Sequence, residues 1–330
     1  MKTIREDILR EKKMKYLFGP VPSRRLGISL GVDLVPHKVC SLNCIYCEVG
    51  RTTNLTIERK EYVPIDEVLE ELNDYLAQKP DLDFVTFSGQ GEPTLNSGLG
   101  KIINFIKDNY PQYQIAVITN GTLFWDSQVR EDVLRADVLL PSLDAVSKMT
   151  FLKLNRPDKE LKIDQIIQGL IELRKEFTGK IYLEIFFVPQ MNDTESELAK
   201  LKEIAGKIKP ELIQLNTLDR PGTESRVKPL SRKRLEEIAE FFKPLPVEII
   251  SKPETRKQIN SFNQDISEQI LETVSRRPST DKDLSDILNL HLNELNKYLS
   301  ELIADGKIEA VKQKRGLFFK IRDQGNNSTN

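Results

Sequence analysis

All three cysteines of this 330-residue chain lie within eight consecutive residues, at Cys40, Cys44 and Cys47. The count is odd and no cysteine remains elsewhere to pair with them, so a disulfide framework is not expected. Such clustering is typical of a reducing compartment, where thiolates bind metal rather than one another. The C-x3-C-x2-C spacing brings three sulfurs to one side of a turn, one fewer than the four that usually hold an iron-sulfur cubane. One iron would therefore stay open to a ligand from outside the protein.

His37 provides an alternative within the same loop. His37-x2-Cys40-x3-Cys44-x2-Cys47 contains the four nitrogen and sulfur ligands of a Cys3His zinc site, which closes a tetrahedron. From the loop alone, both the iron-sulfur and the zinc interpretation remain open.

Composition indicates a globular protein with one large domain, or a large one and a small one. Hydrophobic residues make up 39% and charged residues 30%, and the net charge of -1 provides no overall basic field that would indicate nucleic acid. The first 15 residues are heavily charged, and no apolar run approaches the roughly 20 residues that a membrane span requires. We therefore expect a cytoplasmic protein with no membrane partner.

Hydrophobic periodicity predicts strands that alternate with helices over residues 28–250. The strands are expected at 28–35, 84–88, 115–119, 138–142, 181–188, 212–217 and 247–250. The helices are expected at 65–76, 99–109, 128–135, 163–177, 195–208 and 232–242, after a short polar helix over 3–15 and a proline-containing loop over 18–25. Repeated βαβ units predict an α/β fold, a partial (β/α)6 TIM-type barrel with right-handed crossovers. The chemistry of such folds lies at the C-terminal strand ends, where the cysteine loop follows the first strand.

Polar residues occupy alternate positions along these strands. They are Asp33, Thr86, Ser88, Glu184, Gln214 and Asn216. Parallel strands that are buried on both faces normally form unbroken apolar runs, so the barrel interior is predicted to hold something polar. Glu184 is a weak candidate for holding a cofactor or tuning a proton transfer, and an ordinary buried salt bridge explains it equally well.

A second motif, Ser88-Gly89-Gln90-Gly91-Glu92-Pro93-Thr94, stands at the end of the second predicted strand. Its two glycines let the backbone approach a ligand closely, and a turn that ends in proline leaves carbonyl and amide groups pointing outward. A C-x3-C-x2-C loop with Tyr46 before its last cysteine, followed about 40 residues later by this turn, resembles the radical S-adenosylmethionine (radical SAM) superfamily.

The resemblance implies two cofactors, a 4Fe-4S cluster on the three cysteines and S-adenosylmethionine (SAM), whose amino and carboxylate groups chelate the open iron. The residues that it assigns to SAM are Tyr46 near the adenine, Ser88, Gly89, Gln90, Gly91, Glu92 and Pro93 at the amino group, and Asn120, Ser142 and Asp144 at the nucleoside. Ordinary turn and cap chemistry is the alternative for the last three. The implied reaction is reductive cleavage of SAM to a 5'-deoxyadenosyl radical that abstracts hydrogen from a substrate. A small electron donor of the ferredoxin or flavodoxin type is the implied partner.

Residues 18–27 and 30–36 are similar to a prokaryotic iron-sulfur oxidoreductase group related to the wybutosine tRNA-modifying enzymes. This chain departs from those tRNA enzymes because it has no cysteines for a second cluster and no flavodoxin-like domain. RNA, and tRNA in particular, is the expected substrate class. A peptide or protein substrate, or a small metabolite, remains open.

The expected domains are a barrel over 1–250 with an N-terminal extension over 1–27, a linker over 251–262, a winged helix-turn-helix-like domain over 263–323 and a disordered tail over 324–330. Within the small domain, helices at 266–274, 281–288 and 292–304 precede a hairpin at 308–321, which is the winged-helix order.

The charges of the small domain do not decide what it binds. The hairpin supplies cations, whereas the third helix carries Glu294, Glu301 and Asp305 against Lys297, and phosphate-dominated binding favours basic surfaces. DNA reading, docking of an RNA or peptide substrate, and a structural role all remain open. A zinc-stabilised winged-helix regulator is the alternative to an enzyme.

Overall fold

The structure is a computed structural model that describes residues 14–23, 25–218, 222–224, 226–250, 264–276, 278–288, 290–313 and 316–322. It divides into two compact units, one of Ser23–Arg256 and one of Met1–Pro22 with Lys257–Asn330. The N-terminal residues are thus grouped with the small C-terminal domain, whereas the sequence predicts that they extend the barrel. The predicted helix over 3–15 lies almost wholly outside the described residues, and the linker over 251–262 and the tail over 324–330 lie outside them completely.

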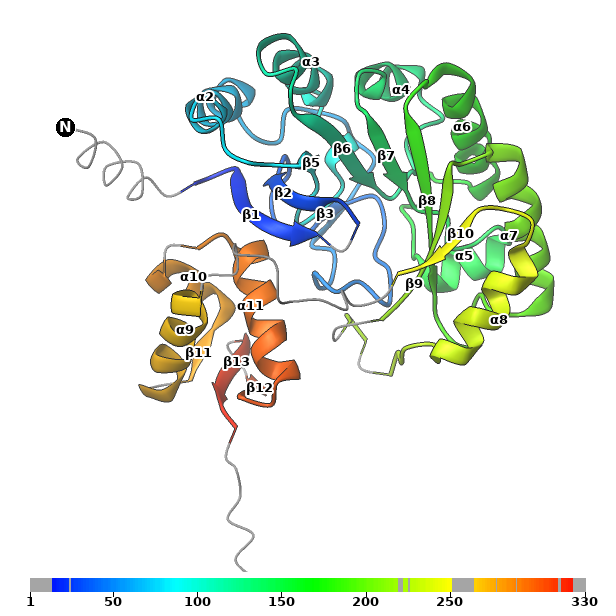
Figure 1. Cartoon of the computed structure of the whole chain (residues 1–330). Coiled ribbons are helices and arrows are strands. Elements are labelled where there is room, and N and C mark those ends of the chain that lie inside the picture. Colours follow the sequence, from blue (N-terminus) through cyan, green and yellow to red (C-terminus); the bar gives the residue numbers. More distant parts are fainter. Residues whose placement is uncertain are drawn as a thin grey trace, which may run out of the picture. The chain divides into compact units, whose positions relative to one another are not determined.

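The larger unit is built on a parallel sheet whose strands pair in chain order, β2-β5-β6-β7-β8-β9-β10 (Figure 1). The strands are β2 (Gly27–Val32), β5 (Phe84–Phe87), β6 (Gln114–Thr119), β7 (Val138–Pro141), β8 (Lys180–Phe187), β9 (Leu212–Thr217) and β10 (Val247–Ile249). Neighbours in sequence that are also parallel neighbours require crossover connections, which the helices provide. The predicted α/β fold of the partial-barrel kind is confirmed.

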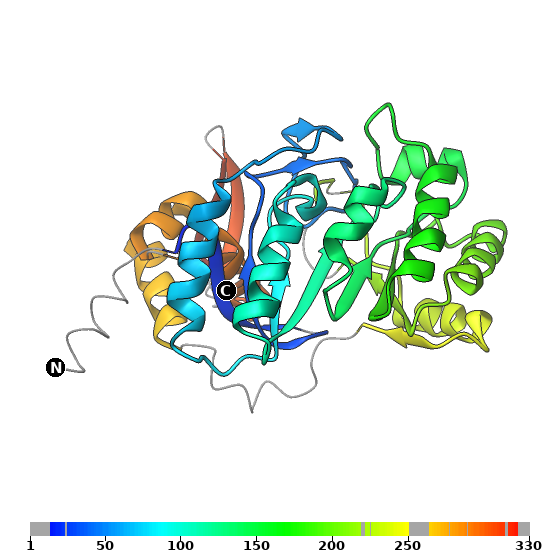
Figure 2. The same ribbon diagram turned by 90° about the horizontal axis from the view of Figure 1, so that it is seen from above.

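The helices of this unit lie along the outside of the sheet (Figure 2). They are α2 (Ile65–Leu76), α3 (Leu99–Asn109), α4 (Ser127–Val133), α5 (Lys148–Leu154), α6 (Ile163–Glu176), α7 (Glu195–Ile208) and α8 (Arg232–Phe242). Side-chain caps start three of them, since Asp126, Thr194 and Ser231 accept hydrogen bonds from backbone N–H groups of α4, α7 and α8. Only α5 is absent from the predicted set.

The two faces of the sheet differ in character. Residues that face the helices, such as Val117, Leu139 and Leu183, are 0% exposed and apolar. On the other face, the strand register aligns Glu184 with Gln214, and both are buried. The polar residues that the alternation singled out therefore lie on this face beside apolar ones such as Leu140, and the idea that the interior holds something polar stays a prediction.

The smaller unit contains α9 (Gln264–Arg276), β11 (Ser279–Thr280), α10 (Asp281–Leu288), α11 (Leu292–Ala304), β12 (Ile308–Gln313) and β13 (Gly316–Ile321). The three strands form an antiparallel sheet in the order β11-β13-β12. Ile270, Leu284, Leu295 and Ile308, none more than 1% exposed, belong to its hydrophobic core. The element order is the predicted one, and the assignment as a winged helix stays a prediction.

Residues 17–23 form a strand, β1 (Leu17–Ser23), where the sequence predicts a loop. The prolines of this segment misled the prediction, although their fixed φ suits an extended strand wherever their missing N–H is not needed. Within the smaller unit, the Phe18 ring stacks on His291 with 4.8 Å between centroids, and the Gly19 backbone hydrogen-bonds to Glu294. These contacts explain why this strand is grouped with the C-terminal residues.

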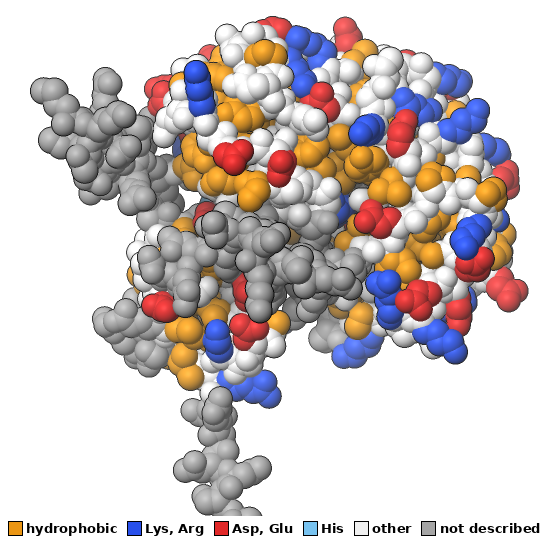
Figure 3. Space-filling view, viewed as in Figure 1, with side chains coloured by type: hydrophobic (Ala, Val, Ile, Leu, Met, Phe, Trp, Pro, Cys, Tyr) orange, Lys and Arg blue, Asp and Glu red, His pale blue; other side chains and the backbone are white. Residues whose placement is uncertain are grey.

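None of the described helices is long and apolar enough to cross a membrane. On the face that Figure 3 shows, basic and acidic side chains are interspersed. This distribution agrees with the near-zero net charge of the sequence.

Candidate functional site

The cysteine loop begins at the short strand β3 (Val39–Cys40), which pairs in parallel with β4 (Asn54–Leu55). The chain that follows α5 supports the loop, because Asn43 and Ile45 donate backbone hydrogen bonds to the carbonyls of Asn155 and Leu154 at 2.9 and 3.0 Å. The loop is thus held by residues that are more than 100 positions away in the sequence.

Each of the three sulfurs accepts a hydrogen bond from a different side chain. Asn120 Nδ2 lies 3.5 Å from Cys40 Sγ, and Asn155 Nδ2 lies 3.5 Å from Cys44 Sγ. Lys38 Nζ lies 3.0 Å from Cys47 Sγ. All three cysteines are half-buried. The structure therefore presents three sulfurs with their donors already in place.

Burial, followed by the charge of Glu92, raises the pKa of the Cys40 thiol to about 11. The pKa of Cys44 is also raised, first by burial and then by the charge of Asp144. Burial alone would lower the pKa of Lys38, but the charges of the three cysteines raise it instead. The raised pKa values of Cys40 and Cys44 favour protonated thiols at these two residues, and metal binding would release their protons.

The turn at residues 89–93 lies directly against the cysteine loop. Lys38 N donates to Gln90 O at 2.9 Å, and Glu92 N donates to Val39 O at 3.0 Å. A Cβ atom on Gly91 would come within 2.1 Å of the Val39 carbonyl oxygen, so only glycine permits this approach. The two sequence motifs, which are about 40 residues apart, form one continuous surface.

The other residues of the turn are fixed by the neighbouring strands. Ser88 N donates to Val32 O at 3.2 Å, and Pro93 begins a 3-10 turn, Pro93–Leu95. Gly89 packs so closely on Asp33 that a Cβ atom would lie 2.2 Å from Asp33 Oδ1.

The carboxylate of Glu92 is turned into the protein and is 2% exposed. It accepts hydrogen bonds from Thr94 N and Oγ1, from Thr119 Oγ1 and from Asn120 N, at 2.6 to 3.0 Å. Burial raises its pKa, and these hydrogen bonds oppose the shift. Glu92 therefore ties the ends of β5 and β6 together, and the backbone of the turn is the part that remains for a ligand.

Tyr46 and Asp144 form the other side of the site. The Tyr46 hydroxyl donates to Asp144 Oδ2, and the Tyr46 ring stacks on Phe186 with 4.1 Å between centroids. Asp144 also accepts from Asn155 Nδ2 and from Phe186 N, both at 2.8 Å. Burial raises the pKa of Asp144 to about 6, and the hydrogen bond from Tyr46 is the first of the interactions that oppose this shift.

Ser142 lies between β6 and β8, since its N–H donates to Thr119 O and the residue bridges to Glu184.

Two candidates are engaged differently from what the sequence suggests. The side chain of Asn120 bonds to Cys40 and, at 2.9 Å, to Ser41 Oγ, so it serves the cysteine loop. Glu184 forms an ion pair with Arg25 and accepts a hydrogen bond from Asn216 Nδ2 at 3.0 Å. The salt-bridge alternative for Glu184 therefore has direct structural support.

His37, the fourth ligand of the zinc alternative, is exposed, and its Nδ1 hydrogen-bonds to the side chain of Gln90. Among the described residues, no three His, Cys, Asp or Glu side chains are grouped to hold one metal ion. The cysteines of a cubane bind different irons, so they need not surround a single ion. The position of His37 favours the iron-sulfur interpretation.

The chain matches the family model of the radical SAM superfamily over residues 34–201. The chain belongs to the radical SAM superfamily. The matched stretch contains the three cysteines, the turn at 89–93 and the strand ends that carry Asn120 and Asp144.

The chain is also similar to curated relatives, and its fold is similar to that of a solved radical SAM enzyme. The chain is 33% identical to UPF0026 protein MJ1312 of Methanocaldococcus jannaschii, over 91% of its own length and 96% of that protein. It is 36% identical to a protein named GTPase Obg from Brachyspira hyodysenteriae over 90% of its own length, and it spans 44% of that relative. A radical SAM methyltransferase structure from Sphaerobacter thermophilus has a TM-score of 0.52 at 17% identity, over 67% of this chain and 65% of that one, which shows a shared fold.

Radical SAM enzymes bind a 4Fe-4S cluster and SAM. The residues present fit this requirement, because three adjacent thiols with hydrogen-bond donors could bind three irons of a cubane. No fourth cysteine exists in the chain to close the cluster. The backbone of the turn at 89–93 lies beside them, where a ligand of the fourth iron would have to be held.

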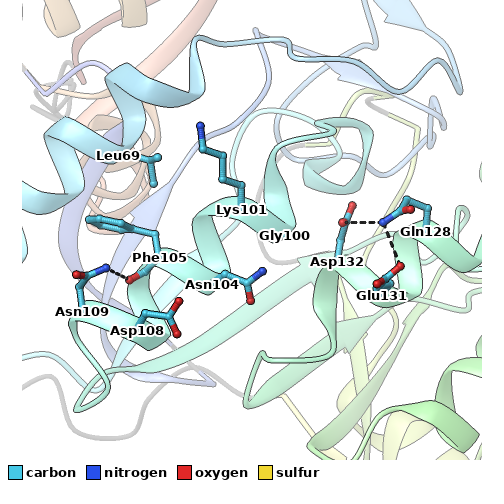
Figure 4. A pocket seen from close by; sticks show the side chains of 10 residues that line it. All are labelled: Leu69, Gly100, Lys101, Asn104, Phe105, Asp108, Asn109, Gln128, Glu131 and Asp132. Carbon is cyan, nitrogen blue, oxygen red and sulfur yellow. Dashed lines mark hydrogen bonds between the residues drawn. The ribbon is translucent and has the colours of Figure 1, made fainter.

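A groove of about 590 Å³ lies elsewhere, on the helical side of the barrel, between α3 and α4 (Figure 4). Its polar walls are already hydrogen-bonded, since Gln128 Nε2 donates to Glu131 and Asp132 at 3.4 and 3.5 Å, and Arg135 donates to Asn104 and Asp108 at 3.0 and 2.7 Å. No residue of the cysteine loop or of the turn lines it. We therefore assign the chemistry to the cysteine loop and not to this groove.

Two residues that the sequence did not single out belong to the site, namely Lys38 and Asn155. Asn155 follows α5, the helix that periodicity missed. Lys38 has a positive φ of 57°, which a sequence does not reveal for a lysine. No local signal in the sequence could have paired Arg25 with Glu184, 159 positions away.

Proposed function

We propose that Cys40, Cys44 and Cys47 hold the 4Fe-4S cluster and that the protein uses it to cleave SAM reductively. The observation that carries this proposal is the direct contact between the cysteine loop and the turn at 89–93. When bound and reduced, the cluster supplies the electron that breaks a C–S bond of SAM, which gives methionine and a 5'-deoxyadenosyl radical that takes hydrogen from the substrate. A small ferredoxin- or flavodoxin-type protein is the proposed source of that electron.

The protein's own residues hold and orient SAM in this proposal. The backbone of residues 89–93 receives the amino group, because the Glu92 carboxylate is already occupied by four donors. Tyr46 and Asp144 provide an aromatic face and a buried acceptor for the nucleoside, with Ser142 beside them. Asn120 contributes indirectly, because its side chain hydrogen-bonds to Cys40 and Ser41 of the cysteine loop. Glu184 and Arg25 form an ion pair in the barrel interior.

Single Cys→Ala variants test the cluster assignment. Each of Cys40→Ala, Cys44→Ala and Cys47→Ala should lose the visible absorbance of the cluster and the release of 5'-deoxyadenosine under anaerobic, reducing conditions. Iron and sulfide analysis of the same samples separates loss of the cluster from loss of activity. A triple variant that kept both the absorbance and the release would end this assignment.

RNA, tRNA in particular, is the substrate class that we propose. The similarity of residues 18–27 and 30–36 to the oxidoreductase group beside the wybutosine enzymes supports it, as does a small domain with the winged-helix element order. Deleting residues 263–330 should then spare the substrate-free release of 5'-deoxyadenosine while abolishing turnover of RNA. Modification changes confined to proteins or small metabolites in a deletion strain, with RNA unchanged by mass spectrometry, would redirect the proposal to those classes.

A further inference from the structure

Lys38 is a cation in a position where both its charge and its backbone are unfavourable. Its residue is 3% exposed, and a buried ammonium group is costly unless it is paired and hydrogen-bonded. Its φ of 57° lies in the left-handed region, which is strained for a residue with a Cβ atom. Glycine would avoid both penalties and asparagine would reduce them. The lysine side chain must therefore do something that compensates for them.

The backbone around Lys38 fixes where this side chain points. Lys38 N donates to Gln90 O at 2.9 Å, and Lys38 O accepts from Thr53 N and Asn54 N at 3.1 and 3.2 Å. The residue is thus held from both sides, by the turn at 89–93 and by the chain that leaves the cysteine loop. The left-handed conformation is over-determined by these bonds, and the side chain is directed at Cys47.

The hydrogen-bond donors of the three cysteines differ in charge and in distance. Cys40 and Cys44 each accept a bond from a neutral amide at 3.5 Å, whereas Cys47 accepts one from an ammonium group at 3.0 Å. Hydrogen bonds from charged donors are shorter and about twice as strong as neutral ones. In a buried setting, the positive charge also acts over a greater range than in water.

We propose that Lys38 is a positioning residue that raises the reduction potential of the cluster through its hydrogen bond to Cys47. This inference rests on the proposed function, since it requires the cluster to be held by the three cysteines. Reduction adds one negative charge to a cluster that three thiolates already make negative. A buried cation at one of these sulfurs stabilises the reduced form more than the oxidised form, and charge and hydrogen bonds at the sulfurs are among the factors that set such potentials. Lys38 thereby eases electron transfer from the donor.

The test compares three variants with the wild type after anaerobic loading with iron and sulfide, in the absence of SAM. Lys38→Met removes the charge and keeps the length of the side chain, and Lys38→Arg keeps the charge. Lys209→Met is the matched control, because Lys209 is also a lysine with positive φ, 53°, but is exposed at the end of α7. The readout is a redox titration of the cluster followed by the electron paramagnetic resonance signal of its reduced form.

For Lys38→Met, the ratio of reduced to oxidised cluster at a fixed potential should fall about tenfold, which is 59 mV for a one-electron couple. Lys38→Arg and Lys209→Met should stay within about twofold of the wild type, by the same conversion. Equal potentials for Lys38→Met and the wild type would overturn the inference. So would equal potentials combined with weaker SAM binding, which would mean that Lys38 serves the SAM carboxylate.

Loading itself distinguishes the remaining outcomes. If Lys38→Met binds no iron, Lys38→Gln, which keeps a donor without the charge, is titrated in its place under the same criterion. If neither loads while Lys38→Arg does, the cation at this position is needed for assembly of the cluster and not for tuning its potential, and the inference fails. If none of the three loads, Lys38 is needed for assembly and not for tuning, and the inference fails. A wild-type protein that assembles no four-iron cluster would instead refute the proposed function.

Discussion

The two faces of the sheet differ in character along β8 and β9, although consecutive residues of the same strand supply them. On the helix side, Leu183 and Ile213 are 0% exposed and apolar. On the inner side, Glu184 and Gln214 are almost as deeply buried but polar. Most inner polar groups are bonded to one another, yet Gln214 Oε1 finds no hydrogen-bond partner among the described residues. Burial of apolar side chains on the outer face stabilises the folded protein. Burial of polar groups on the inner face lowers its free energy of unfolding wherever such a group lacks a hydrogen-bond partner.

The largest expected effect comes from the outer face. Leu183→Ala removes a fully buried side chain from β8 and should lower the free energy of unfolding by about 3 kcal/mol, because a cavity forms where the helices pack. Urea denaturation of the metal-free protein measures it. Leu134→Ala is the control, since Leu134 is 37% exposed, and it should cost less than about 1 kcal/mol. Similar losses for the two variants would contradict the contrast between the faces.

The neighbouring residue on the same strand tests the inner face. Glu184→Gln leaves Arg25 without its carboxylate in a largely buried setting, with 15% of the Arg25 side chain exposed, and should cost about 2 kcal/mol. The double variant Arg25→Met with Glu184→Gln should recover part of the loss, because the unpaired charge is removed as well. A double-mutant cycle from denaturation curves gives the coupling energy. A coupling energy near zero would show that the ion pair contributes nothing to the interior.

Because Asp33 is buried, it makes the free energy of unfolding dependent on pH. Burial raises its pKa from the ordinary 3.8 to about 7, so the folded protein keeps a proton that the unfolded chain has lost between these values. Stability is therefore highest below about pH 4 for this group, and it falls as the pH rises through about 7. Between pH 6 and pH 8, the wild type should lose about 1 kcal/mol more than Asp33→Asn, which cannot ionise. If the free energy of unfolding changed with pH in the same way for both proteins, the pKa of Asp33 would have its ordinary value and the prediction would be wrong.

The sequence predicts the outer face of the sheet and its helices better than it predicts the contacts of the inner face. The outer face and its helices follow local periodicity, and the helices at 99–109, 195–208 and 232–242 agree with the sequence to the residue. The seven-residue helix α5 was missed, although α4, which is equally short, was predicted. The hydrogen bonds between Glu92 and Thr119 and between Asn120 and Ser41 could not be predicted, because these partners are distant in the sequence.

The cysteines and the turn could be singled out because their residue types and spacing carry the chemistry by themselves. Their donors could not, because Asn155 is 111 positions from Cys44 and local patterns contain no information about such pairs. Lys38 is close to Cys47 in the sequence, but its direction depends on a left-handed backbone that neighbours from two other segments impose.

The smallest expected effect on stability separates a structural role from a ligand-binding role. Tyr46→Phe removes the hydrogen bond to Asp144 and the long one that the hydroxyl accepts from Asn155 Nδ2 at 3.4 Å. Asp144 keeps the donors Asn155 and Phe186 N, and the stacked ring is retained. The free energy of unfolding should therefore fall by only about 0.5–1 kcal/mol. Tyr113→Phe is a matched control, because the Tyr113 hydroxyl also donates one hydrogen bond, to Pro80 O at 2.9 Å, away from the site. The two variants should lose similar stability, whereas only Tyr46→Phe should weaken SAM binding to the cluster-loaded protein in equilibrium titrations. If both variants bound SAM as the wild type does, the hydroxyl of Tyr46 would have only a structural role, which is to hold Asp144 in the polar interior.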